Sequence, residues 1–169
     1  MDLRLAGYRG HRDGAGFGSL DRPRDEPLVL VRSARLLPPH DPARIEDVVE
    51  FPLALPGRPN AVRGIVERAI RERRLTASVP LEPENPGLCL EFVRCGLVGQ
   101  TVTLGSVLVE RDTSGVHVVP VAGRELHWAL VVHRQRHHMA GVRRLAGIIK
   151  STIADAVRSG PWSGASIVG

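Results

Sequence analysis

The turn Pro56-Gly57-Arg58-Pro59-Asn60 has residue types that could bind an anion. Arg58 carries a planar guanidinium group, which can donate two parallel hydrogen bonds to one carboxylate. Asn60 can cap a following helix, and the first backbone N–H groups of a helix, together with the helix dipole, favour negative charge. The same pattern fits an ordinary strand–turn–helix unit with no ligand. This stretch alone favours that simpler interpretation by about two to one, because ligands occupy only some such crevices.

A group of three histidines near the C-terminus could supply zinc ligands. His133 and His137 would lie one helical turn apart, and His138 is adjacent. No carboxylate or thiol is placed nearby in the sequence to complete a zinc site. Arg134 and Arg136 also make the segment cationic, which opposes a metal ion. We therefore expect a polar loop here and no metal site.

The sequence motifs of common enzyme classes are missing. Ser33, Ser106 and Ser114 lack the G-x-S-x-G pattern of a nucleophile elbow, and no P-loop lysine is present. The glycine-rich stretch Gly14–Gly18 resembles a fragment of a nucleotide-binding loop, but no helical pattern follows it, so a loop is the better interpretation. We expect no catalytic residue, no cofactor and no enzymatic activity.

Composition limits the partners of the chain. Its 169 residues suffice for one domain or two small lobes, and 43 % hydrophobic residues are ordinary for a soluble globular protein. The net charge is +5, but Lys150 is the only lysine among 23 basic residues and aromatic residues make up 4 %, which does not indicate a nucleic-acid-binding surface. No apolar run is long enough to predict a membrane span, and the N-terminus lacks a secretory signal. Cys89 and Cys95 fit buried, free thiols, and we expect a cytoplasmic protein.

A short strand and a helix would position the turn. The apolar run from Phe51 to Leu55 has strand length, and apolar residues from Val62 to Leu75 recur at spacings of three and four, as on one face of a helix. Strands and helices alternate along the rest of the chain, which indicates an α/β fold with a largely parallel sheet and ligands beyond the carboxyl ends of its strands. We expect further strands at 2–8, 26–32, 77–81, 101–104, 116–121 and 126–132, and further helices at 45–49, 88–95 and 141–157. Residues 107–110 begin a short helix or an extended piece.

Five segments, in this order, resemble the effector-binding domain of LysR-type transcriptional regulators. They are DLRLAGY, DEPLVLV, FPLALPGRPNAVRGIVERAI, FVRCGLVGQTVTLGSVLVE and VHVVPVAGRELHWALVVHRQRH. The family has a D-L-A-L strand, then E-P-L-V-L-V, then P-L-I-L-P-G-R-P and a helix, then A-G-L-G-Y-T-V-L-P-x-S, and finally a strand that leads to a C-terminal helix. The match PLALPGRPNAVR is the most specific piece, and the resemblance covers about residues 2–157.

Two departures from the family pattern concern the pocket and the N-terminus. The segment Thr101–Ser106 stands where the family has T-V-L-P-x-S but lacks its proline, and one extra residue lies near Val98. The family's winged helix-turn-helix, linker helix and first β–α units do not precede Asp2. The resemblance therefore implies a regulator truncated at its N-terminus.

The resemblance implies an α/β fold of two Rossmann-like lobes, of the type II periplasmic-binding-protein kind, joined by two crossing strands. Residues 27–125 would form the second lobe, and residues 1–26 and 126–169 would form an incomplete first lobe. The crossing strands would lie near 28–31 and 126–132, and the ligand cleft would lie between the lobes.

The implied function is to bind a small, anionic metabolite and so control transcription in a bacterial cell. DNA would be contacted only through a helix-turn-helix domain that this chain lacks, the family leaves room for a homo-oligomer, and no membrane partner is expected. The alternative is a solute-binding-like or purely structural α/β remnant without regulatory activity, and an upstream reading frame that encodes a helix-turn-helix would separate the two. The ligand-binding residues that we expect are Tyr8, Gly57, Arg58, Pro59, Asn60, Thr101 and Thr103.

Overall fold

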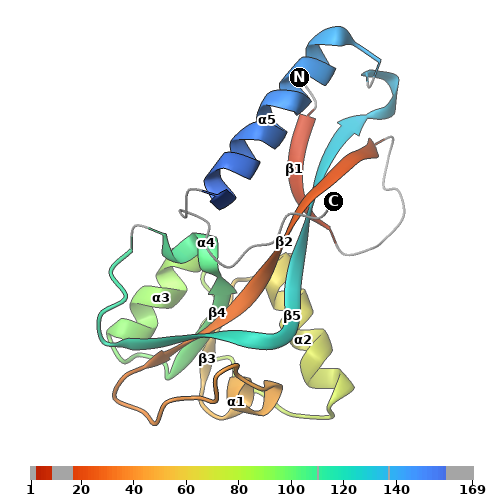
Figure 1. Ribbon diagram of the computed structural model, residues 1–169. Coiled ribbons are helices and arrows are strands. Elements are labelled where there is room, and N and C mark those ends of the chain that lie inside the picture. The colour runs from red at the N-terminus through yellow and green to blue at the C-terminus, as the bar shows by residue number, and fades with distance from the viewer. Residues whose placement is uncertain (1–2, 9–16, 110, 137, 159–169) are drawn as a thin grey trace. The chain divides into compact units, whose positions relative to one another are not determined.

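The computed structural model describes residues 3–8, 17–109, 111–136 and 138–158 (Figure 1). The chain divides into two compact units: unit 1 comprises Met1–Glu26 and Glu125–Gly169, and unit 2 comprises Pro27–Arg124. The elements in chain order are β1 (Leu3–Tyr8), β2 (Phe17–Ser33), α1 (Ile45–Val49), β3 (Leu53–Ala54), α2 (Ala61–Glu72), α3 (Pro86–Arg94), β4 (Gln100–Leu104), α4 (Gly105–Leu108), β5 (Val116–His133), the 3-10 helix η1 (Arg134–Arg136) and α5 (Ala140–Arg158).

The strands form one sheet in the order β1-β5-β2-β4-β3. Strand β3 pairs with β4 in parallel, whereas β1 with β5 and β2 with β4 are antiparallel. The expectation of a largely parallel sheet is therefore wrong for these pairs. Alternating strands and helices predict parallel neighbours only when each helix connects adjacent strands, and β2 lies beside β4, a strand that follows it much later in the chain.

Three expected strands are organised differently from their sequence patterns. The patterns at 116–121 and 126–132 belong to one continuous strand, β5, and Gly123 with its positive φ of 61° does not end it. The pattern at 77–81 forms no strand, and only Leu81 makes an isolated parallel bridge, to Ala54. The expected helices at 45–49 and 141–157 are confirmed by α1 and α5.

In unit 2, helices α2 and α3 cover β4 and β3 on their two sides (Figure 1). Both helices begin at a capping asparagine: the Asn60 side chain accepts from the backbone N–H of Arg63, and the Asn85 side chain accepts from that of Gly87 at 2.7 Å. The core between them is apolar and includes Leu30, Leu53, Leu55, Ile65, Val66, Ala69, Leu90, Val93 and Val102.

Helix α3 buries a different face from the one that its spacing predicts. Leu88, Phe92 and Cys95 recur at helical spacing and would face inward. Phe92 does pack against the core, but Leu88 is 48 % exposed and Cys95 is exposed. Cys89 and Val93 lie on the buried face instead. A helix this short carries two apolar stripes, and its own sequence does not decide between them.

A buried arginine, Arg32 at the end of β2, fixes α1 against the sheet. Its Nε donates to Oε1 of Gln100 at 2.8 Å, and its Nη2 donates to the carbonyl oxygen of Asp47 at 2.8 Å. Its guanidinium group lies over the ring of Phe51, 4.9 Å from the centroid, and forms an ion pair with Glu50 at 2.9 Å. These contacts hold the segment that leads directly into β3 and the turn after it.

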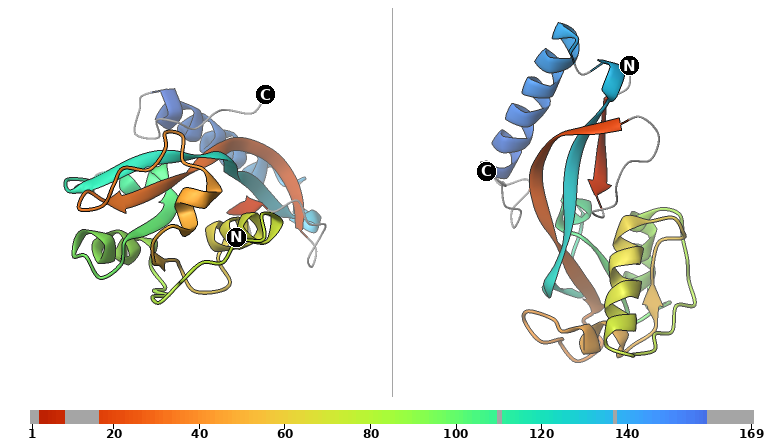
Figure 2. Two further views of the ribbon diagram at one scale, coloured as in Figure 1. Left: turned by 90° about the horizontal axis from the view of Figure 1, so that it is seen from below. Right: turned by 90° about the vertical axis from the view of Figure 1, so that its right-hand side faces the viewer.

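In unit 1, β1 pairs with β5 over the register Leu3↔Val132 to Tyr8↔His127. The right-hand view of Figure 2 shows these two strands side by side. Helix α5 is amphipathic and buries Ala146 and Ile153. None of the helices described, α5 included, has the length and apolar character needed to cross a membrane.

Candidate functional site

The Pro56–Asn60 turn follows the carboxyl end of β3 and is held by backbone hydrogen bonds to a neighbouring segment. Leu55 N–H donates to the carbonyl oxygen of Leu81 at 3.2 Å, and Gly57 N–H donates to that of Pro83 at 3.0 Å. The peptide bond between Arg58 and Pro59 is cis. The turn thus occupies the position after a parallel strand where ligands of α/β proteins bind.

The start of α2 is capped from within the chain. The side chain of Asn60 accepts from Arg63 N–H at 3.1 Å, and its carbonyl oxygen accepts from Gly64 N–H at 3.1 Å. The sequence prediction that Asn60 caps this helix is confirmed. An anion bound at this terminus would therefore be stabilised by the dipole of α2, but one N–H group of the first helical turn is already bonded to the side chain of Asn60.

Arg58 is exposed and is held on one side by a glutamate of α2. Its Nη2 and Nε donate to Oε1 of Glu67 at 2.6 and 3.2 Å, and 70 % of its side chain is accessible to solvent. An incoming carboxylate can replace Glu67 as the partner of Arg58 or share the guanidinium group with it.

Beneath Arg58 lies a buried arginine, Arg63, which links the turn to α2 and to the segment after it. Its Nε donates to Glu67 at 2.7 Å, its Nη2 donates to Glu82 at 2.8 Å, and its Nη1 donates to the carbonyl oxygen of Pro56 at 3.2 Å. Only 7 % of its side chain is exposed. Arg63 therefore fixes the first residue of the turn and both carboxylates at once.

The hydrogen bonds of this cluster shift the pKa values of three of its side chains, those of Arg63, Glu67 and Glu82. The hydrogen bonds that Arg63 donates to Glu82 and Glu67 raise the pKa of its guanidinium group. Burial raises the pKa of Glu67, but hydrogen bonds from Arg63 and Arg58 outweigh burial and hold it below its ordinary value. The hydrogen bond from Arg63 likewise lowers the pKa of Glu82. Two arginines and two glutamates balance, so any preference for anions at the turn depends on the exposed guanidinium group of Arg58.

The two threonines expected at the site lie on β4 and are buried. The hydroxyl of Thr101 donates to the carbonyl oxygen of Ala54 at 2.7 Å and so ties β4 to the end of β3. Tyr8, the remaining expected residue, lies in β1 of unit 1, and its side chain is outside the described part of the structure. Within unit 2, the structure brings the turn and Thr101 to neighbouring parts of the β3–β4 pair.

Sequence reasoning missed the cluster beneath the turn. Arg63 and Glu67 are spaced i,i+4, a spacing that places two side chains together on a helix, and this signal could have indicated their pairing. Nothing in the sequence indicated that Glu82, which lies 19 residues from Arg63, would complete the group.

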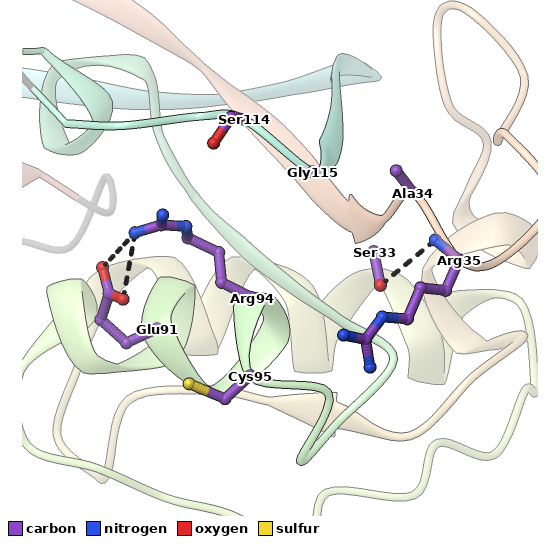
Figure 3. A pocket seen from close by; sticks show the side chains of 8 residues that line it. All are labelled: Ser33, Ala34, Arg35, Glu91, Arg94, Cys95, Ser114 and Gly115. Atoms are coloured by element: carbon purple, nitrogen blue, oxygen red, sulfur yellow. Dashed lines mark hydrogen bonds and ion pairs between the residues drawn. The ribbon is translucent and has the colours of Figure 1, made fainter.

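A second feature of unit 2 is a pocket of about 420 Å³ between the end of β2, α3 and the start of β5 (Figure 3). Arg94 forms ion pairs there with Glu91 at 3.2 Å and with Asp112 at 2.5 Å. Hydrogen bonds from Ser114 hold the pKa of Asp112 below its ordinary value. Cys95 also lines the pocket and is exposed, so the expectation of two buried thiols is wrong for Cys95 and right for Cys89. Of the expected ligand-binding residues whose side chains the structure describes, none lines this pocket.

The family model for the LysR substrate binding domain matches residues 10–154. The chain belongs to this family. Its fold is an α/β fold of the LysR effector-binding kind, similar to periplasmic binding proteins, as the resemblance implied. The LysR substrate-binding domain is a domain of transcription regulators.

Solved structures with this fold share little sequence with the chain. An OxyR mutant from Corynebacterium glutamicum matches with a TM-score of 0.75 and 13 % identity over 94 % of this chain and 50 % of that one. The CcmR regulatory domain of Synechocystis PCC6803, in complex with 2-PG, matches with a TM-score of 0.75 and 13 % identity over 89 % and 73 %. The effector-binding domain of QuiR, in complex with shikimate, matches with a TM-score of 0.63 and 14 % identity over 79 % and 62 %. The chain thus spans half of the OxyR chain, and no curated protein sequence matches it significantly.

Proposed function

We propose that this LysR substrate-binding domain binds a small anionic effector and that the bound state regulates transcription. The observation that carries the proposal is the position of Arg58, an exposed cation on the turn after β3, in a chain whose family match covers that turn. The CcmR domain in complex with 2-PG and the QuiR domain in complex with shikimate, a carboxylate, support it as structural relatives that bind small molecules. The proposed role is binding rather than catalysis.

In the proposed site, Gly57, Arg58, Pro59 and Asn60 contact the effector from the turn. Arg58 gives up its partly exposed ion pair with Glu67 and forms a bidentate hydrogen bond to the effector instead. An ion pair of this exposed kind contributes about 0–1 kcal/mol, so its loss costs little. Thr101 and Thr103 are proposed to contribute from β4. Together, Arg58 and the helix terminus would contribute about 2–4 kcal/mol to anion binding.

We also assign unit 2 to the second lobe of the effector-binding domain and unit 1 to the first. The cleft between lobes and the part of Tyr8 in it stay predictions from the resemblance. DNA contact is proposed to be made by a helix-turn-helix domain of the regulator. Self-association is proposed to follow the oligomeric assembly of the family. The regulator is proposed to act in the cytoplasm. A gel shift with the 169-residue chain should show only weak, salt-sensitive binding, because a net charge of +5 allows non-specific phosphate contact.

The test of effector binding is calorimetry with a panel of small carboxylates and phosphate esters, including shikimate. The Arg58→Ala variant is compared with Arg71→Ala, which removes the same charge from an exposed position at the other end of α2. We expect a ligand whose affinity falls at least about tenfold in Arg58→Ala and stays within about twofold in Arg71→Ala. Equal affinities in both variants would remove Arg58 from the site, and the absence of any ligand for the wild-type chain would favour a structural α/β remnant.

A further inference from the structure

Three potential metal ligands from two neighbouring strands meet in unit 1. Asp25 lies on β2, and Glu125 and His127 lie on β5. One donor atom from each of the three lies within 4.8 Å of the others. Nδ1 of His127 faces both carboxylates, at 2.6 Å from Oδ1 of Asp25 and 3.8 Å from Oε1 of Glu125. The cluster thus places one imidazole nitrogen between two carboxylates.

The distances and the burial of this cluster fit a coordinated ion. Ligands bound at about 2.1 Å around a tetrahedral centre are about 3.4 Å apart, so Asp25 and His127 must separate slightly and Glu125 must move closer. Glu125 can do so because 49 % of its side chain is exposed. The side chains of Asp25 and His127 are only 12 % and 33 % exposed, so solvent reaches these two donors from fewer directions.

The donor set selects the class of ion. Imidazole nitrogen favours transition-metal ions over Mg²⁺ and Ca²⁺, which take oxygen ligands. One histidine and two carboxylates are ligands that Zn²⁺ accepts, and three protein ligands leave a position for water. Two carboxylates also balance the charge of a divalent ion. We infer that Asp25, Glu125 and His127 form a binding site for a divalent transition-metal ion of the Zn²⁺ type, which cross-links β2 and β5.

Sequence spacing conceals this site because the ligands come from segments far apart in the chain. Asp25 and His127 are separated by 102 residues, and only the pairing of elements brings them together. The sequence itself brings together His133, His137 and His138, of which His137 lies outside the described residues, and these histidines are the competing site that an experiment must exclude.

The residue after His127 provides a spectroscopic reporter. Trp128 is one of two tryptophans in the chain, and its Nε1 donates to Glu26 at 2.9 Å, next to Asp25. In a Trp162→Phe background, Trp128 is therefore the only tryptophan. Cu²⁺ bound at the cluster should quench its fluorescence, because quenching by this ion requires close approach.

The decisive experiment is calorimetric titration of Zn²⁺ into the full 169-residue chain and its variants. We expect one ion per chain, and binding at least about tenfold weaker in His127→Gln, since even the loss of a ligand's partner costs about 10–100-fold in affinity. The matched control is His117→Gln, which changes a histidine of the same strand that belongs to no such cluster among the described residues. It should bind Zn²⁺ like the wild type.

Glu125→Gln keeps the test decisive if His127→Gln does not fold, because Glu125 is half exposed and its amide replacement keeps the same shape. Weaker Zn²⁺ binding in Glu125→Gln, with Cu²⁺ quenching of Trp128 reduced in parallel, would support the site. Three results would overturn it: wild-type affinity in these variants, loss of Zn²⁺ binding only when His133, His137 and His138 are all replaced by glutamine, or no Zn²⁺ binding by the wild-type chain.

Discussion

Replacing Arg63 by methionine tests whether the buried arginine holds the turn. Methionine keeps much of the apolar stem but removes the donors to the Pro56 carbonyl oxygen, Glu67 and Glu82. The lost bond to Pro56 contributes about 1 kcal/mol, and the lost bond to the partly buried Glu67 about 1.5–3 kcal/mol. Glu82 is half exposed and regains water, so it adds little. The free energy of unfolding should fall by about 3 kcal/mol, a large share of the stability of an ordinary domain.

The assay is urea unfolding followed by circular dichroism, with Arg71→Met as the control for a charge lost from an exposed position of the same helix. Arg71→Met should change the free energy of unfolding by less than about 0.5 kcal/mol. Arg63→Met should also lose binding of any effector that depends on Arg58, because the turn is no longer fixed at Pro56. A loss below about 1 kcal/mol, with effector binding intact, would refute the idea that this arginine positions the turn.

Three further predictions concern charge and exposure. Glu67→Gln should raise the affinity for an anionic effector by about threefold, because a like charge about 7 Å from the ligand costs about 0.6 kcal/mol in water; an unchanged affinity by calorimetry would contradict this. Burial raises the pKa of Glu67 and of Asp47, but hydrogen bonds outweigh it and hold both pKa values below their ordinary values. The stability that these two carboxylates contribute is therefore complete above about pH 5 and is lost as the pH falls through the lowered pKa. Urea midpoints between about pH 5 and pH 3 should therefore fall less steeply in Glu67→Gln than in the wild type, and equal slopes would count against it. A thiol reagent should modify Cys95 quickly and Cys89 only after unfolding, because Cys89 is buried and burial raises its pKa; equal rates would contradict the burial of Cys89.

The sequence predicted the elements around the turn because their signals are local. Asn60 precedes apolar residues at helical spacing and caps α2 as expected. The order of the LysR-like segments predicted the family, which the match over residues 10–154 confirms. Strand directions were harder to predict, because which strands become neighbours depends on contacts between distant segments.

The cluster beneath the turn shows where local reasoning ends. A sequence identifies Arg58 as a cation at a helix start and pairs Glu67 with Arg63 by their spacing, but Glu82 joins the cluster only through tertiary packing. The same holds for Arg32 and Gln100, 68 residues apart, which no spacing pattern connects. Buried charged groups need partners, so a polar residue inside an apolar pattern is a signal that a partner exists without showing which residue it is.

The central claim, that an anionic effector binds at the turn after β3, is tested most directly by amide NMR shifts of the isotope-labelled chain during titration with the effector found by calorimetry. If the effector binds at the turn, the largest shifts fall on Gly57, Arg58 and Asn60, and they disappear in Arg58→Ala. Shifts centred instead on Ser33, Arg35 and Ser114, around the pocket beside α3, would contradict it and move the site to the other feature of unit 2.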